Sequence, residues 1–227
     1  MSSAREAILA RLRHAYARDE QAQAAAVAEA WDRLGRREPN LVPERGQRDP
    51  EGRVALFTEM AQAVMADVQR VPSLQDVPAA VAAYLRRHNV PQRVVLAPDP
   101  LLDRCGWESQ PLLRVRRGTA VGSDLVGVTV AEAGVAETGT LLLASSPERP
   151  TLLAYLPETS IVLLPAERIE GAYEQAWEQV RALPDGPPRS VNLVTGPSRS
   201  ADIAGKLELG AHGPRRLLVL VVDRVDA

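Results

Sequence analysis

The stretch of residues 126–144 constrains the fold most, because two apolar runs in it meet at a short polar segment. Residues 126–130 are rich in valine and residues 141–144 are entirely apolar, which is typical of buried strands. Burying an unpaired polar group costs about 1–3 kcal/mol. We therefore expect the polar segment to interrupt a core strand for a structural or functional reason; it consists of Glu137, Thr138, Gly139 and Thr140.

The rest of the chain alternates between amphipathic stretches and short β-branched runs. This order predicts an α/β fold, in which crossover helices connect the strands of a mostly parallel sheet. We expect strands at residues 66–71, 93–97, 112–115, 160–164, 190–195 and 216–222. We expect helices after the Asp49-Pro50 start signal and at residues 77–89, 151–156 and 167–183.

Residues 1–50 are predicted to form a helical arm and a linker, which precede an α/β domain at residues 51–227. Capping-box spacing at Ser3 opens one helix, and an alanine-rich stretch from 19 to 34 predicts another. The proline- and arginine-rich residues 35–50 are typical of a linker or surface loop. Two interpretations fit the arm: it packs on its own domain, or it meets a partner or a second copy.

Composition and charge narrow the class of protein. The net charge is -2 and the pI is about 6.0, which argues against nucleic acid or an anionic membrane as the main partner. No apolar run reaches about 18 residues, so we expect a cytoplasmic protein that does not enter a membrane. Cys105 is the single cysteine, so this chain has no disulfide framework and no cysteine-ligated cluster or zinc. We expect no metal site, because the chain shows no cluster of His, Asp and Glu.

A second polar segment, residues 195–203, follows the strand expected at 190–195, and His212 lies in a glycine-containing loop just after it. Ligands of open α/β sheets bind outside the carboxyl ends of the strands, and hydroxyls with one arginine suit an anion. The alternative is a sharp turn with a capping serine and a solvated arginine. The segment has neither Walker-loop nor dinucleotide-binding spacing. The candidate anion-binding residues come from both polar segments and the histidine loop. They are Thr138, Gly139, Thr140, Gly196, Ser198, Arg199, Ser200, Asp202 and His212.

Glu137 is the candidate for chemistry in the first polar segment. If the segment is a strand, Glu137 and Gly139 lie on one face and Thr138 and Thr140 on the other. A carboxylate between buried strands fits a nucleophile or general base with a shifted pKa. The same carboxylate fits equally a structural role, in which it accepts several internal hydrogen bonds and fixes the crossing of the two strands.

The paired motifs resemble the LUD domain family, the lactate-utilisation family, and within it the short subunit. The resemblance rests on AETGTLLL at residues 136–143, TGPSRSADI at 195–203 and LGAHGP at 209–214, in this order and at these separations. It covers roughly residues 50–227, and the N-terminal arm fits it too. Ser200 stands where the family pattern has threonine, which retains the hydroxyl.

The resemblance implies a three-layer α/β/α fold, similar to the superfamily of CoA transferases, ribose-phosphate isomerases and glucosamine-phosphate deaminases. It implies a part in the oxidation of L-lactate to pyruvate, together with iron–sulfur and cysteine-rich oxidoreductase subunits. The iron–sulfur clusters are then expected only on those partner subunits. Glutamate is the nucleophile in CoA transferases of this superfamily, so Glu137 corresponds to it by fold-level analogy alone.

Three functions are therefore open. The first is a non-catalytic or co-catalytic subunit of a lactate-oxidising complex. The second is a stand-alone enzyme that acts on a small acyl or phosphate anion, with Glu137 as base or nucleophile and Arg199 as the anion clamp. The third is a regulatory module that binds a carboxylate. In each case we expect a small carboxylate or phosphate ligand, and a homo-oligomer is compatible with all three.

Overall fold

The computed structural model describes residues 4–16, 20–36, 42–184, 186–201, 207–210 and 212–225. The chain divides into two compact units, residues 1–41 and residues 42–227. The first unit holds helices α1 (Ala4–Tyr16) and α2 (Glu20–Arg36). Along α2, Val27, Trp31 and Leu34 recur at helical spacing and are each more than half exposed. The arm is therefore helical, as expected.

The second unit is built on a six-stranded sheet with the order β1-β12-β7-β4-β2-β3, in which every neighbouring pair is parallel. The central strands are buried on both faces, which is why their sequences are nearly continuous apolar runs. The strands are β1 (Asp67–Ser73), β2 (Arg93–Leu96), β3 (Arg114–Arg117), β4 (Val126–Val130), β7 (Thr159–Pro165) and β12 (Arg216–Arg224).

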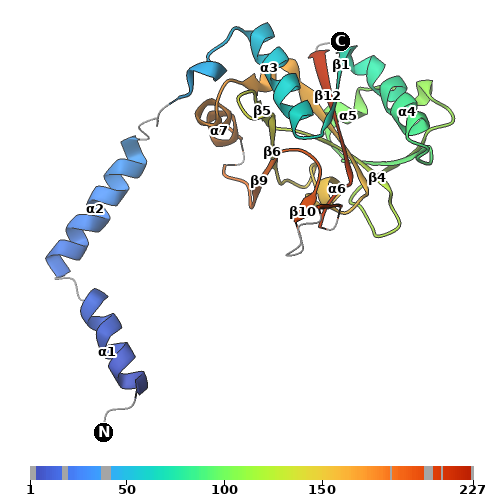
Figure 1. Ribbon diagram of the computed structural model, residues 1–227. Helices are drawn as coiled ribbons and strands as arrows, with labels where there is room; N and C mark the ends of the chain where they lie inside the picture. Colours follow the sequence, from blue (N-terminus) through green and yellow to red (C-terminus); the bar gives the residue numbers. More distant parts are fainter. Residues whose placement is uncertain are drawn as a thin grey trace. The chain divides into compact units, whose positions relative to one another are not determined.

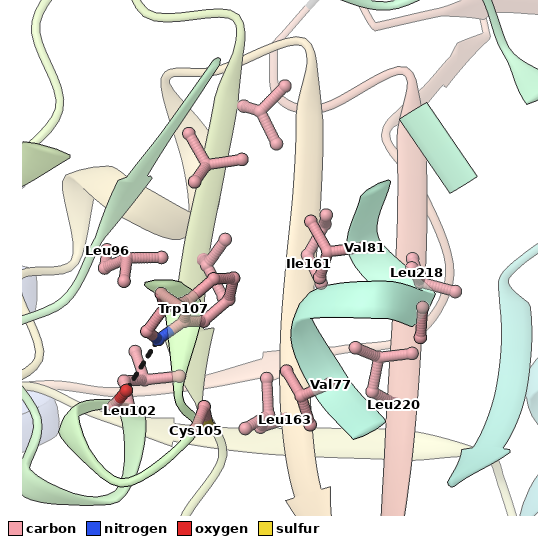
Figure 2. Close-up of a cluster of buried hydrophobic side chains, with 14 of the residues drawn as sticks. Val77, Val81, Leu96, Leu102, Cys105, Trp107, Ile161, Leu163, Leu218 and Leu220 are labelled. Atoms are coloured by element: carbon pink, nitrogen blue, oxygen red, sulfur yellow. Dashed lines mark hydrogen bonds between the residues drawn. The ribbon is translucent and has the colours of Figure 1, made fainter. Parts of the chain in front are cut away.

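One face of this sheet packs against α4 (Val77–Arg87), α5 (Pro100–Asp103) and Trp107. Figure 2 shows Val77 and Val81 of α4 beside Ile161 and Leu163 of β7 and Leu218 and Leu220 of β12. The indole nitrogen of Trp107 donates to the carbonyl of Leu102 at 2.6 Å, so its polar atom is satisfied inside the core (Figure 2).

The other face packs against α3 (Pro50–Ala63), α6 (Leu152–Tyr155) and a second sheet. This four-stranded sheet has the order β8-β5-β6-β9, and α7 (Tyr173–Arg181) covers its outer side. In Figure 1, α4 and α7 accordingly lie on opposite sides of the two sheets. The strands are β5 (Ala133–Val135), β6 (Thr140–Ala144), β8 (Ile169–Glu170) and β9 (Val191–Val194). A hairpin of β10 (Arg199–Ala201) and β11 (Leu207–Leu209) follows.

The expected α/β class with a mostly parallel, helix-flanked sheet is confirmed. Three local expectations are wrong. Residues 136–139 form the turn of an antiparallel hairpin between β5 and β6 and do not interrupt a strand, so the predicted alternation of side chains does not apply. Strand β9 joins the four-stranded sheet, so residues 195–199, which follow it, do not lie at the carboxyl edge of the parallel sheet. The helix expected from residue 167 begins at Tyr173, because residues 169–170 pair with β5.

Within the part of the chain that the structure describes, no helix has both the length and the apolar character needed to cross a bilayer.

The reactivity of the Cys105 thiol is a test of how tightly the main core is packed. Its thiol is fully buried and lies 3.4 Å from the carbonyl oxygen of Leu101, and burial raises its pKa to about 12. A thiol with a raised pKa stays neutral and unreactive near neutral pH. We expect no reaction with a thiol reagent such as DTNB in the folded protein, and one equivalent in denaturant. Fast labelling of the native protein would contradict this burial.

Candidate functional site

The turn at residues 136–139 is held against helix α3 by a glycine. Gly139 has φ +64, a left-handed conformation that glycine adopts without steric cost. A Cβ atom at this position would lie 2.2 Å from the backbone nitrogen of Ala61, so no other residue fits without displacing α3. The same residue therefore satisfies both the turn and its contact with the helix.

Gly196, in the second polar segment, makes an equivalent contact. Its φ is +77, and a Cβ atom there would lie 2.3 Å from the carbonyl oxygen of Val64, the residue that caps α3. The glycine expected to let the backbone approach a ligand thus lets it approach a helix. Both motifs are anchored at the last turn of α3.

Hydroxyl groups connect the two motifs directly. Thr138 and Thr140 share a hydrogen bond of 2.8 Å, and the phenol of Tyr173 lies 3.1 Å and 3.0 Å from their oxygens. Thr140 also shares a 2.8 Å hydrogen bond with Thr195, which follows β9. We call these four residues the hydroxyl cluster. The proximity of the two segments, which the sequence left open, is therefore a feature of the fold.

Glu137 lies in the same turn but apart from this cluster. Its side chain is 6% exposed, its backbone nitrogen donates to the carbonyl of Gly171 at 3.1 Å, and Arg45 Nε lies 3.9 Å from its carboxylate. A carboxylate held near an arginine in a hairpin turn is well suited to fixing that turn. Glu137 is not among the residues that line the cavity next to the second motif, which is described below.

A cavity of about 340 Å³ gathers the candidate residues of the second motif. Its walls are largely apolar, with Leu143, Val162 and Leu217 among them. Its polar groups come from the end of α6, the start of β7, the 195–199 segment and the loop before β12. They are Tyr155, Ser160, Thr195, Ser198, Arg199 and His212. Apolar walls with a few convergent polar groups are the usual form of a small-molecule site, and we call this one the Arg199 cavity.

The cavity has donors suited to an anion. Arg199 is exposed and can present its guanidinium fork to a carboxylate. His212 is exposed in the loop that ends at Pro214. Burial raises the pKa of the Tyr155 hydroxyl, which therefore stays protonated. Together these groups can bind and orient an anionic group.

Not every predicted residue reaches this cavity. Gly196, Ser198, Arg199 and His212 line it, whereas Thr138, Gly139 and Thr140 do not. Thr195 lines the cavity and belongs to the hydroxyl cluster, so it joins the two. The side chain of Ser200 and the whole of Asp202 lie outside the described residues.

A buried ion cluster lies at the carboxyl ends of the parallel strands β2 and β4, and the sequence analysis did not predict it. Asp99 follows β2 and Glu132 follows β4, and Arg149 lies between them. Arg149 Nε donates to Asp99 at 2.6 Å and its Nη1 donates to Glu132. Asp99 also caps α5 by accepting from the backbone nitrogen of Leu101. The sequence feature that could have indicated the cluster is a carboxylate within three residues of the end of each strand.

The charges of this cluster support each other. Burial disfavours the charged form of Arg149, but the attraction and hydrogen bonds of Asp99 and Glu132 outweigh it and raise the pKa of Arg149. The three side chains are 4–19% exposed. Among the described residues, no group of three or more His, Cys, Asp and Glu side chains is placed to hold a metal ion.

These features define the class of protein. Residues 114–222 match the family model of the LUD domain, a span that includes both motifs and most of the lining of the Arg199 cavity. Residues 114–222 are thus similar to a LUD domain, in agreement with the resemblance predicted from the motifs.

Particular relatives are named for lactate utilisation. The chain is 38% identical over 101 residues to lactate utilization protein C of Macrococcus caseolyticus, which covers 43% of this chain and 44% of that protein. It is 35% identical over 120 residues to lactate utilization protein C of an Exiguobacterium species, which covers 51% of each. An uncharacterized protein of Neisseria meningitidis is 40% identical over 96 residues, or 42% of this chain and 41% of that protein. The chain thus spans about half of their length.

A solved structure has the same fold. A DUF162 family protein from Deinococcus radiodurans superposes with a TM-score of 0.60 at 21% identity, over 77% of this chain and 99% of that one.

Replacing Gly139 with alanine tests the contact with α3. The left-handed conformation and the overlap with Ala61 together predict a loss of about 2–5 kcal/mol in the free energy of unfolding. Denaturant unfolding of Gly139→Ala measures it. Gly122→Ala is the control, because nothing lies within 4 Å of a Cβ atom there. Equal stabilities of the two variants would refute the proposed contact.

Replacing Arg149 with methionine tests the buried ion cluster. Two buried carboxylates would lose their shared partner, so we expect a loss of about 3–5 kcal/mol in unfolding free energy. Arg181→Met removes the exposed pair with Glu178 and should cost less than about 1 kcal/mol. A small loss in both variants would mean that Asp99 and Glu132 do not depend on Arg149.

Proposed function

We propose that this chain takes part in the utilisation of L-lactate as a ligand-binding subunit, and that the Arg199 cavity binds a small carboxylate. The convergence of Ser198, Arg199 and His212 on one cavity carries this proposal. Support also comes from the LUD domain match and from the names of the lactate utilization relatives.

In this proposal each polar group has a defined part. The guanidinium of Arg199 holds the carboxylate, ideally through two parallel hydrogen bonds. His212 and the serine hydroxyl of Ser198 position the rest of the ligand, and the apolar walls exclude water. The chain itself then binds and orients its ligand.

Electron transfer is assigned to partner subunits. Oxidising lactate to pyruvate releases two electrons and two protons, so an acceptor is required. Cys105 is buried in the main core and is the only cysteine of the chain, so the thiolates for an iron–sulfur cluster must come from elsewhere. We therefore propose iron–sulfur and cysteine-rich oxidoreductase subunits as partners.

The alternative enzyme with Glu137 as nucleophile has less support. Glu137 does not line the Arg199 cavity, and its surroundings suit a role in the hairpin turn. A nucleophile must reach the reacting atom of its substrate.

The ligand-binding role is tested with Arg199→Gln. We expect L-lactate or pyruvate to raise the melting temperature of the wild-type protein, because a ligand that binds only the folded state stabilises it. The variant should bind about 10–100-fold more weakly, since it loses charged hydrogen bonds of about 1.5–3 kcal/mol. Arg189→Gln, exposed and outside this cavity, is the control. An unchanged response in Arg199→Gln would refute the site.

The subunit role is tested separately by purifying the tagged full chain from lactate-grown native cells. We expect cysteine-rich subunits, identified by mass spectrometry, with the visible absorption of iron–sulfur clusters. Purification of the chain without such subunits would contradict the subunit role. It would not affect the ligand-binding role, which the Arg199→Gln variant tests.

A further inference from the structure

A second cavity of about 340 Å³ lies beside the start of β2 and β4 and shares no lining residue with the Arg199 cavity. Val95 and Val126 form part of its wall, and its polar side chains are Arg93, Arg116, Ser123 and Asp124. We call it the Arg93 cavity. It belongs to neither sequence motif.

Arginines of neighbouring strands lie side by side here. Arg93 of β2 is the register partner of Arg114 of β3, and register partners on adjacent strands point to the same face of a sheet. Arg116, two residues beyond Arg114, shares that face. Arg93 and Arg116 line the cavity, and Arg114 lies next to Arg93 on the same face without lining it.

Two of these positive charges are not neutralised. Arg116 is held by Asp124 and by the carbonyl of Thr119, and Arg117 pairs with Asp103. Arg93 and Arg114 have no acidic partner among the residues that the structure describes. Like charges directly opposite one another destabilise a sheet, so the fold retains an unfavourable pair at this position.

Protection of the sheet edge does not account for the pair. Charged side chains on an edge strand prevent pairing with other chains, and this explains the arginines of β3. Arg93, however, is the first residue of β2, an internal strand that pairs with β3 from Arg93 and with β4 from Val95. Its position requires another reason.

We propose that the Arg93 cavity binds a phosphate group. Arg93 and Ser123 in its wall are the ligands, and Arg114, the register partner of Arg93, adds positive charge from beside the cavity. Two unneutralised charges match a dianion, and the guanidinium fork matches phosphate oxygens. The cavity is larger than a phosphate ion alone and has apolar walls, so a phosphate monoester with a small organic body fits it better.

The test uses the full chain and its melting temperature. The probes are inorganic phosphate and glycerol 3-phosphate at about pH 8, where phosphate is largely dianionic, with sodium chloride at equal ionic strength as the reference. We expect both phosphates to raise the melting temperature above the chloride reference. A larger shift with the monoester identifies esters as the ligand class, and equal shifts identify the phosphate group alone.

Arg93→Gln and Arg114→Gln should each weaken apparent phosphate affinity about tenfold or more. Without phosphate neither variant should melt below the wild type, because the like-charge pair is relieved. Arg86→Gln on the exposed surface of α4 should keep the full phosphate response. A wild-type shift no larger than that of chloride, or a full response in Arg93→Gln and Arg114→Gln, would overturn the proposal.

Discussion

The close approach of two glycine turns to the end of α3 is the constraint on which the site depends. Gly139 and Gly196 both have left-handed backbones, and neither leaves room for a side chain against residues 61–64. Helix α3 itself packs on the parallel sheet through residues such as Phe57. The two motifs are therefore positioned relative to the main sheet through one helix, and the hydroxyl cluster and the Arg199 cavity follow from that placement.

The strands of the parallel sheet could be predicted because they are buried on both faces and their apolar runs are unbroken. The turn at residues 137–140 could not be predicted, because an apolar run does not show which sheet a strand joins. Strand β6 pairs with β5 across the turn and with β9 some fifty residues later, as Leu141 and Val194 show. The convergence of Gly196, Ser198, Arg199 and His212 was anticipated, whereas the Asp99–Glu132–Arg149 cluster required the strand order.

The polar features occupy different ends of the parallel sheet. The Arg199 cavity includes Ser160 and Leu217, near the amino ends of β7 and β12. The Arg149 cluster lies at the carboxyl ends of β2 and β4, the edge at which open α/β sheets usually bind ligands. There, however, the carboxylates are already satisfied by an arginine. We accordingly propose ligand binding at Arg199 and Arg93, which form no salt bridge with the residues that the structure describes.

The hydroxyl cluster has a consequence for any ligand that touches Thr195. Thr138, Thr140, Tyr173 and Thr195 share four hydrogen bonds, and each hydroxyl has a single proton. While all four hydrogen bonds are formed, each of the four protons is therefore used within the cluster, and Thr195 is the donor to Thr140. Thr195 can offer a ligand only its lone pairs, so it favours a ligand hydroxyl over a carboxylate oxygen. An α-hydroxy acid has both groups, and this wall of the cavity would distinguish it from the corresponding keto acid.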